Sequence, residues 1–126
     1  MAETGLRLRT AAPSGDWRSF IVCAPSPGVT RGQPDLIHDT VGVYMQDAAT
    51  GVGVAFCYHA EKIEVPLRTG SSYGLLEAGD KVFFDHVGQD FSADASGNLW
   101  CGICLKKTAV GDTYVLIDLK GDKAHS

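Results

Sequence analysis

Large apolar residues occupy every second position in several short segments of this chain. In the clearest segment, Val52, Val54, Phe56 and Tyr58 alternate with small or polar residues. Successive side chains of a β-strand point to opposite faces, so this period of two predicts a strand with one large apolar face, which we expect to point into the core. Related patterns predict further strands at residues 17–24, 35–37, 40–47, 63–67, 81–85, 99–106 and 114–119.

Turn signals separate these segments. Glycine occurs in each of them, at residues 25–28, 49–51, 78–80, 96–98 and 110–112. Strong helix formers nowhere recur at the spacing of a helix, so helix should be scarce. Short strands at such intervals, without room for long crossovers, are typical of a small β-barrel or a sandwich-like domain. The predicted fold class is therefore all-β.

The length of 126 residues leaves room for one domain of ordinary size. Residues 11–15 are typical of a hinge, and the residues before them lack the strand pattern. We therefore expect residues 1–15 to form an extended, flexible N-terminal arm that becomes ordered on a partner. The β-barrel domain is expected to cover residues 16–120, and residues 121–126 to form a C-terminal tail.

The charge balance argues against nucleic acid as a partner. The chain has 11 Lys and Arg residues against 15 Asp and Glu residues, a formal net charge of −4 at pH 7. A general binder of the phosphate backbone needs the opposite sign. The apolar stretches are far shorter than the roughly 20 residues of a membrane helix, and the first residues lack the apolar segment of a secretory signal. We expect no membrane partner, and a cytosol-like compartment in which the cysteines stay reduced.

One short motif suggests redox chemistry. The run Trp100-Cys101-Gly102-Ile103-Cys104 resembles the Trp-Cys-Gly-Pro-Cys of thioredoxins, in which the first cysteine gains reactivity at a helix N-terminus. Here Ile103 replaces the proline, and too few residues follow for a helix before the next turn. We favour a strand in which Cys101 and Cys104 are packing residues on opposite faces. A small redox protein that uses this pair is the alternative.

The same pair could join Cys23 and Cys57 in a structural zinc site of four thiolates. However, Cys23 and Cys57 stand singly in apolar strand patterns, where a free cysteine behaves as a small hydrophobic residue. The four histidines are dispersed, and the sequence has no serine-hydrolase elbow or phosphate-binding loop. We therefore predict no metal, no cofactor and no catalytic residue.

A ligand-binding β-barrel module is a further alternative. Such a module, for instance one that binds carbohydrate, would be a monomer and would gather aromatic side chains in a concave pocket. The candidate side chains are Trp17, Tyr44, Tyr58, Tyr73 and Trp100.

The order of small motifs along the chain is more specific than any single motif. They are Pro-Gly-Val-Thr-Arg-Gly-Gln-Pro at 27–34, Thr-Val-Gly-Val at 40–43, Asp-Ala-Ala-Thr-Gly-Val-Gly-Val-Ala at 47–55, Ile-Glu-Val-Pro-Leu at 63–67, Ala-Gly-Asp-Lys-Val-Phe-Phe-Asp at 78–85, Cys-Gly-Ile-Cys at 101–104 and Ala-Val-Gly-Asp-Thr-Tyr-Val-Leu-Ile-Asp-Leu at 109–119. Over residues 16–120 this series resembles the small head decoration, or capsid cement, proteins of tailed bacteriophages. In that family a small apolar strand takes the place of residues 100–104, so the resemblance favours packing cysteines.

The resemblance implies a structural and not an enzymatic role. Such proteins sit on the outer surface of an icosahedral head and hold neighbouring major capsid proteins together, often as trimers at local three-fold positions. We therefore expect the major capsid protein and further copies of this chain, in a homotrimer, as partners. The expected location is the virion, after synthesis in the host cytoplasm.

The N-terminal arm offers candidate capsid-binding residues. Leu6 and Leu8 share one face of an extended segment, whereas Arg7 and Arg9 share the other. Added to a sheet edge of a capsid protein, this segment would bury the leucines and leave the arginines for carboxylates. Arg18 is a third positive side chain that could meet an acidic shell. The alternative for the arm is an inert, disordered tail.

Overall fold

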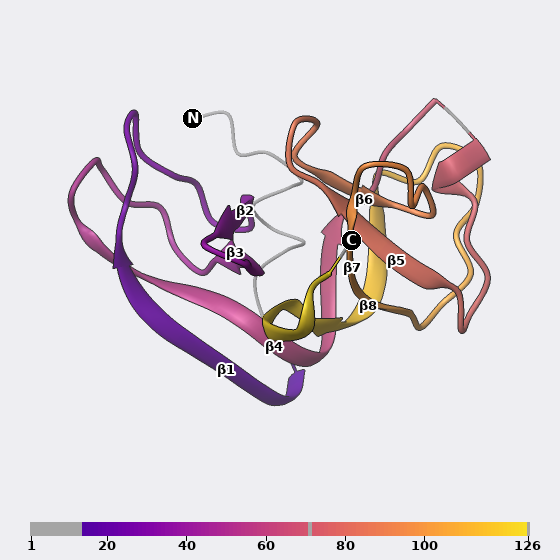
Figure 1. Ribbon diagram of the computed structural model, residues 1–126, viewed down its shortest axis with the longest axis horizontal. Coiled ribbons are helices and arrows are strands. Elements are labelled where there is room, and N and C mark those ends of the chain that lie inside the picture. Colours follow the sequence, from indigo (N-terminus) through magenta and orange to yellow (C-terminus); the bar gives the residue numbers. More distant parts are fainter. Residues whose placement is uncertain (1–13, 71, 126) are drawn as a thin grey trace.

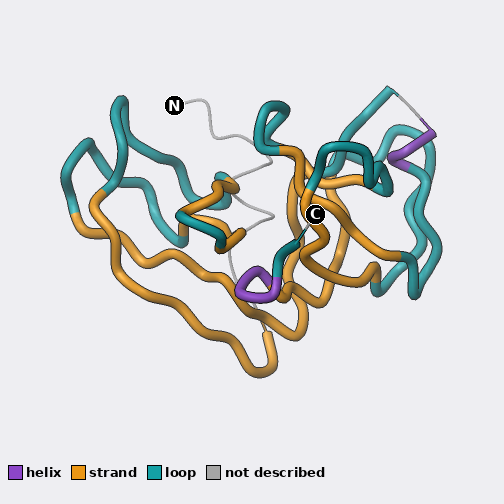
Figure 2. The backbone as a smooth tube through the Cα atoms, in the orientation of Figure 1, coloured by secondary structure: helices purple, strands orange, loops and turns teal. Residues whose placement is uncertain are grey.

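The fold is built from antiparallel strands, and the predicted all-β class is confirmed (Figures 1 and 2). The structure is a computed structural model that describes residues 14–70 and 72–125. Within these residues the helical elements are two 3₁₀ helices of three residues each, and none has the length and apolarity to cross a bilayer. The elements are β1 (Ser14–Cys23), β2 (Pro34–Ile37), β3 (Thr40–Tyr44), β4 (Gly53–Pro66), η1 (Ser72–Gly74), β5 (Lys81–Asp85), β6 (Asp90–Ser92), β7 (Leu99–Cys104), β8 (Tyr114–Lys120) and η2 (Gly121–Lys123).

β4 is a long strand that runs through both parts of the sheet and joins them, and the two parts are described below (Figure 1). The sequence predicted separate strands at 52–58 and 63–67, whereas the structure joins them into one strand of 14 residues. At ~3.3 Å per residue, its path is roughly 45 Å long. The pairing of β4 with β8 is irregular between Ala60 and Ile63, and its pairing with β1 skips Tyr58. These bulges bend β4 and hide its continuity from the period-two pattern.

The second half of β4 belongs to a nearly closed barrel. From there the sheet continues through β8, β7, β5 and β6. The circle closes where β6 returns to the end of β4. Leu67 and Phe91 form a parallel bridge there, and the Arg68 amide donates to the Phe91 carbonyl at 2.9 Å. We call β5 to β8 and the second half of β4 the barrel.

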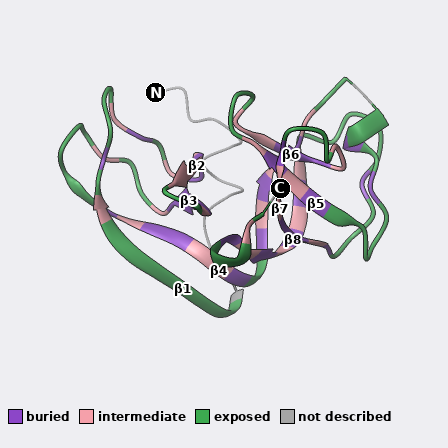
Figure 3. Cartoon of the chain, viewed as in Figure 1, coloured by how far each residue is buried: buried purple, intermediate pink, exposed green. Residues whose placement is uncertain are grey.

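The first half of β4, with β1, β2 and β3, forms a second part that we call the wing. Cys57 of β4 pairs with Ser19 of β1 and with Val43 of β3, so β1 and β3 flank β4 on opposite sides. β2 extends the sheet on the β3 side. No strand of the described chain pairs with the other side of β1. β1 is therefore an outer edge of the sheet, and most of its residues are exposed (Figure 3).

Two hydrophobic cores lie on opposite faces of the β3–β4 pair. Tyr44 pairs with Phe56, and the adjacent Val43 pairs with Cys57. Neighbouring residues of a strand point to opposite faces, so the first pair enters the wing core and the second the barrel core. The wing core consists of Ala24, Val29, Tyr44, Val54 and Phe56, with Val22, Ile37 and Ala48 packed against it.

This arrangement corrects the prediction for the row at 52–58. Val54 and Phe56 are buried as expected and Tyr58 is half-buried, but Val52 is 51% exposed, since it lies in the turn before β4. Cys57, on the small face of the predicted strand, is fully buried as well, as its interpretation as a small hydrophobic residue requires. The alternation rule assumes one core, whereas β4 has a core on each face at this point.

Several strand boundaries also differ from the prediction. β1 begins earlier than expected, at Ser14, and contains a bulge at Gly15 opposite Glu61. The φ angle of Gly15 is 75°, a conformation that glycine adopts without strain. β3 and β7 end sooner than predicted. β6 was not predicted, because three residues are too few for alternation to be visible.

The C-terminal residues pack on both parts. Gly121 is buried, and a Cβ atom there would collide with the Val41 carbonyl oxygen of β3. Trp100 and His125 exchange main-chain hydrogen bonds of 2.7 and 3.2 Å. Residues 121–125 are therefore held against the wing and the barrel.

Candidate functional site

The outer strand β1 carries an exposed apolar surface. Trp17 is 46% exposed and Ile21 is 71% exposed. They lie on one face of the strand, with Ser19 between them, and we call these three residues the β1 row. Apolar side chains on an unpaired strand edge promote aggregation unless a partner covers them. The β1 row is therefore a candidate interaction surface.

The opposite face of β1 is attached to the wing core. The Phe20 ring lies 5.6 Å from the Phe56 ring and is stacked on the Tyr58 ring at 5.3 Å. Cross-strand aromatic contacts of this kind stabilise a strand pair. They hold β1 on β4, so that the β1 row is presented on a packed support.

Arg18, one of the predicted capsid-binding residues, also lies on β1. Its guanidinium is 3.9 Å from the Asp16 carboxylate, and the two side chains are 63% and 58% exposed. An exposed pair of this kind contributes little to stability, so Arg18 can turn to a partner at small cost. The other predicted residues, Leu6, Arg7, Leu8 and Arg9, lie outside the described residues.

The loops at the far end of the wing form a second exposed area (Figure 1). The β1–β2 and β3–β4 loops are joined by main-chain hydrogen bonds of 2.9 and 3.0 Å between Val29 and Ala48. The Arg31 amide donates to the Asp47 carboxylate at 2.9 Å. Val52 is exposed beside them. These contacts give the loop pair, which we call the wing tip, a defined shape for docking.

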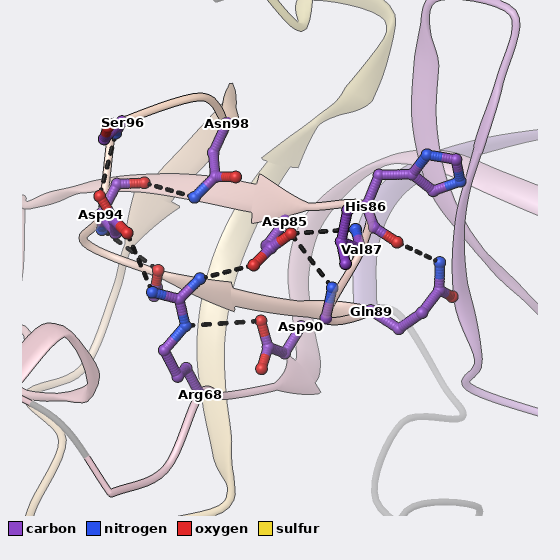
Figure 4. A network of polar contacts seen from close by, with 11 residues as sticks. Arg68, Asp85, His86, Val87, Gln89, Asp90, Asp94, Ser96 and Asn98 are labelled. Carbon is purple, nitrogen blue, oxygen red and sulfur yellow. Dashed lines mark hydrogen bonds and ion pairs between the residues drawn. The ribbon is translucent and has the colours of Figure 1, made fainter.

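An arginine among three aspartates holds the closing edge of the barrel together (Figure 4). Arg68 donates to Asp85 at 2.8 Å and to Asp94 at 3.0 Å, and its Nε lies 3.8 Å from Asp90. The four side chains are 20% to 24% exposed. Asp85 and Asp94 also accept amide hydrogens from the loops that follow them. The cluster therefore fixes the end of β4 and two loops at once.

The carboxylates of this cluster differ in their pKa. The amide of Ser96, and then the contact with Arg68, lower the pKa of Asp94. Burial raises the pKa of Asp90, and the charge of Arg68 offsets this effect only in part. Oδ1 of Asp90 has no hydrogen-bond partner within the described chain. Across residues 14–70 and 72–125, no group of three or more His, Cys, Asp or Glu side chains is arranged to hold a metal ion, and we interpret the cluster as structural.

The predicted strand at Cys101 and Cys104 is confirmed as β7. The prediction that the two thiols point to opposite faces was wrong. The pairing of β7 with β5 is irregular beside Cys101, and this bulge lets both thiols pack in the barrel core. Burial raises the pKa of both thiols. The thiolate that disulfide exchange requires is therefore disfavoured.

The other two cysteines have different surroundings from each other. Cys57 is buried, and burial raises the pKa of its thiol to about 11. Cys23 is exposed at the end of β1. All four thiols are free, and the structure does not bring them together as the zinc alternative requires.

The aromatic candidates for a ligand pocket are divided among the wing, the barrel and η1. Trp100 lines a shallow apolar hollow with Lys81, Phe83 and His125, and the other candidates do not share it. The buried Tyr44 hydroxyl donates to Asp35 at 2.7 Å. The remaining candidates are Trp17 on β1, Tyr58 in the wing and Tyr73 in η1.

In a comparison with protein-family models, residues 13–119 match the model of the phage cement protein family. The chain belongs to that family. A comparison with curated proteins gave no match. The matched residues include both the wing and the barrel, so the family resemblance inferred from the motif order is confirmed.

Membership of the phage cement protein family assigns a structural, non-enzymatic role, capsid binding and a place on the virion capsid. The relevant parts of such a protein are its surfaces. Accordingly, the exposed β1 row and wing tip are the candidate binding surfaces, whereas the buried thiols and the aspartate cluster have structural roles.

Sequence reasoning pointed to the arm and missed the β1 row. The strand itself was predicted, but residues 20–22 are a continuous apolar run, which is also typical of a strand buried on both faces. The signal that could have separated the two cases is the pair of charges, Asp16 and Arg18, around Trp17. Charged residues are frequent on edge strands and rare in buried ones.

Proposed function

We propose that this phage cement protein clamps neighbouring major capsid proteins on the outer surface of the head. The observation that carries the proposal is the two-part architecture, in which one strand, β4, belongs to both the wing and the barrel. A clamp across a subunit junction needs two separated attachment surfaces on one body. Membership of the cement family supports the capsid as the object to which both surfaces attach.

We assign part of the grip to the N-terminal arm. Leu6 and Leu8 add a strand to a sheet edge of the capsid protein and become buried there. Arg7 and Arg9, together with Arg18, meet acidic groups of the shell. The exposure of Arg18 supports this assignment, as does its position on β1, which takes up the last residues of the predicted arm.

The protein acts as a homotrimer at local three-fold positions, and it joins the particle after synthesis in the host cytoplasm. Exposed apolar residues on both the wing and the barrel support contacts with more than one neighbour. Three linked copies hold the shell more strongly than one, because each further attachment is intramolecular. The exposed residues in question are Ile21, Val52, Leu75, Val87 and Val110.

The test is binding to purified heads that lack the protein. Full-length protein should co-sediment with the heads and raise the temperature at which they release DNA. A variant without residues 2–12 should bind more weakly, with an almost unchanged melting temperature. Matched variants separate the two contributions: Leu6→Ser with Leu8→Ser removes the apolar face, and Arg7→Ser with Arg9→Ser removes the charges.

Two outcomes would count against parts of the proposal. Equal binding of the truncated and full-length proteins would make the arm an inert tail and place the grip on the wing and the barrel. No binding of the full-length protein to such heads would overturn the clamp itself.

A further inference from the structure

β1 offers a regular stretch of strand edge that no other strand of the described chain covers. The bulge at Gly15 interrupts β1 near its start. The second irregularity in its pairing lies on the β4 side, where Tyr58 is skipped, so residues 16–23 of β1 are continuous. Within the described chain, the outer main-chain groups of this stretch face no other strand. A further strand can therefore add along it by main-chain hydrogen bonds.

The side chains of this stretch are self-complementary about Ser19. In an antiparallel pair of two copies centred on Ser19, Trp17 of one copy lies opposite Ile21 of the other. The small serine at the centre leaves room for the large side chains on either side. Pairs of an aromatic and a β-branched residue across two strands are favourable. The two exposed apolar side chains of the β1 row, Trp17 and Ile21, then contact each other across the two strands.

The charges of the stretch select the same arrangement. Asp16 and Arg18 are the charged residues among residues 16–23. In the antiparallel pair, Arg18 lies opposite Phe20 of the other copy, where a guanidinium can rest on the ring. No like charges then face each other. A parallel pair in register would place like charges side by side and would be destabilised.

We infer that β1 pairs antiparallel with β1 of a second copy of this chain, about a two-fold axis at Ser19. The two wing sheets then form one continuous sheet. A two-fold contact uses the same patch on both copies and does not close a ring of three. It is therefore additional to the proposed trimer, and on a shell it joins one trimer to the next, because local two-fold axes relate neighbouring three-fold positions. The inference does not depend on the clamp.

The test uses two single variants, Trp17→Glu and Ile21→Lys. Each sets a charge against an apolar residue of the other copy and should weaken self-association about tenfold or more, as measured by sedimentation equilibrium. Positions 17 and 21 are ~13 Å apart along one strand, too far for contact within a copy. An equimolar mixture of the two variants should associate again, because the introduced carboxylate of one faces the introduced ammonium of the other.

A cross-link tests the register. With Cys23→Ser as background, Ser19→Cys should form a disulfide between copies under mild oxidation, whereas Arg18→Cys should not, because position 18 lies opposite position 20. Glu77 and Lys107 form an exposed ion pair outside β1 at 3.5 Å. The charge reversals Glu77→Lys and Lys107→Glu should leave self-association unchanged.

The inference is overturned if the single variants associate like the wild type, or if their mixture stays as weak as either alone. It is also overturned if Ser19→Cys gives no cross-link in solution or on heads. Head binding is measured in parallel on the same variants. Lost self-association with retained head binding supports the pairing, whereas normal pairing without any head binding would reject the clamp and keep the pairing.

Discussion

The guanidinium of Arg68 lies 3.0 Å from the carboxylate of Asp94 and links the end of β4 to the loop that follows β6. The main chain of the same arginine closes the barrel through its hydrogen bond to Phe91. One residue therefore secures the closing edge in two independent ways, by backbone pairing and by its side chain.

Replacing Arg68 should loosen this edge. We expect Arg68→Met to lower the free energy of unfolding by about 2 kcal/mol, because the variant leaves neighbouring carboxylates in a partly buried site without their cation. Urea unfolding followed by tryptophan fluorescence measures this loss. Arg68→Lys keeps the charge but not the forked geometry, so its free energy of unfolding should lie between those of the wild type and Arg68→Met. A methionine variant as stable as the wild type would contradict a structural role for the cluster.

The pH dependence should separate Asp94 from Asp90. Because the folded-state pKa of Asp94 is lowered, its ionised form stabilises the fold above the pKa of the unfolded chain, and this contribution is lost as pH falls through the folded-state pKa. Asp94→Asn should therefore destabilise the protein at neutral pH and cost little in acid. Urea unfolding at both pH values is the measurement.

Asp90→Asn is the matched control in the same cluster. The folded-state pKa of Asp90 is raised, so its ionised form is disfavoured in the fold as pH rises above the pKa of the unfolded chain. At neutral pH the asparagine variant should unfold at the same or a higher urea concentration than the wild type. Equal destabilisation by both substitutions would refute this assignment.

The thiols should differ sharply in reactivity. Cys23 is exposed and the other three cysteines are buried, and burial raises the pKa of Cys57 to about 11. A chromogenic disulfide reagent at mildly alkaline pH should modify one thiol per chain in the native protein and all four after denaturation. Cys23→Ser should abolish the native reaction. A second fast thiol would show that the barrel core opens readily.

The two free cysteines of β7 should be replaceable without loss of function. Cys101→Ala and Cys104→Ala should each cost roughly 1 to 2 kcal/mol of stability through the small cavity they leave, and attachment to heads should persist. Valine at the same positions controls for lost volume. Loss of head binding in a variant with an undisturbed fold would instead favour redox chemistry at this pair.

The turns could be predicted from single residues. Gly28, Gly51, Gly79, Gly97 and Gly111 all have positive φ values, and each lies in one of the turns marked in the sequence. The reason is local, because a left-handed backbone at these points excludes most side chains. Aspartates beside them act as expected: Asp80 and Asp112 accept amide hydrogens within their own turns.

The course of β4 and the surface of β1 could not be predicted in the same way. Bulges near Tyr58 and between Ala60 and Ile63 reset which face points inward, and a bulge appears only when two strands are seen together. The exposure of Trp17 and Ile21 likewise depends on β1 being an edge, which is set by pairings far apart in the sequence. The assignments to the arm remain predictions.

The continuous path of β4 has a mechanical consequence. Ala60 is paired with Trp17 of β1 on one side and with Leu119 of β8 on the other. A pull that separates the wing from the barrel along β4 therefore loads both ladders in shear, so that many hydrogen bonds must break together and not one after another. The covalent backbone itself carries the tension between the two cores. If the shell swells beneath it, such a subunit would resist stretching as one unit, and its strands would not separate one hydrogen bond at a time.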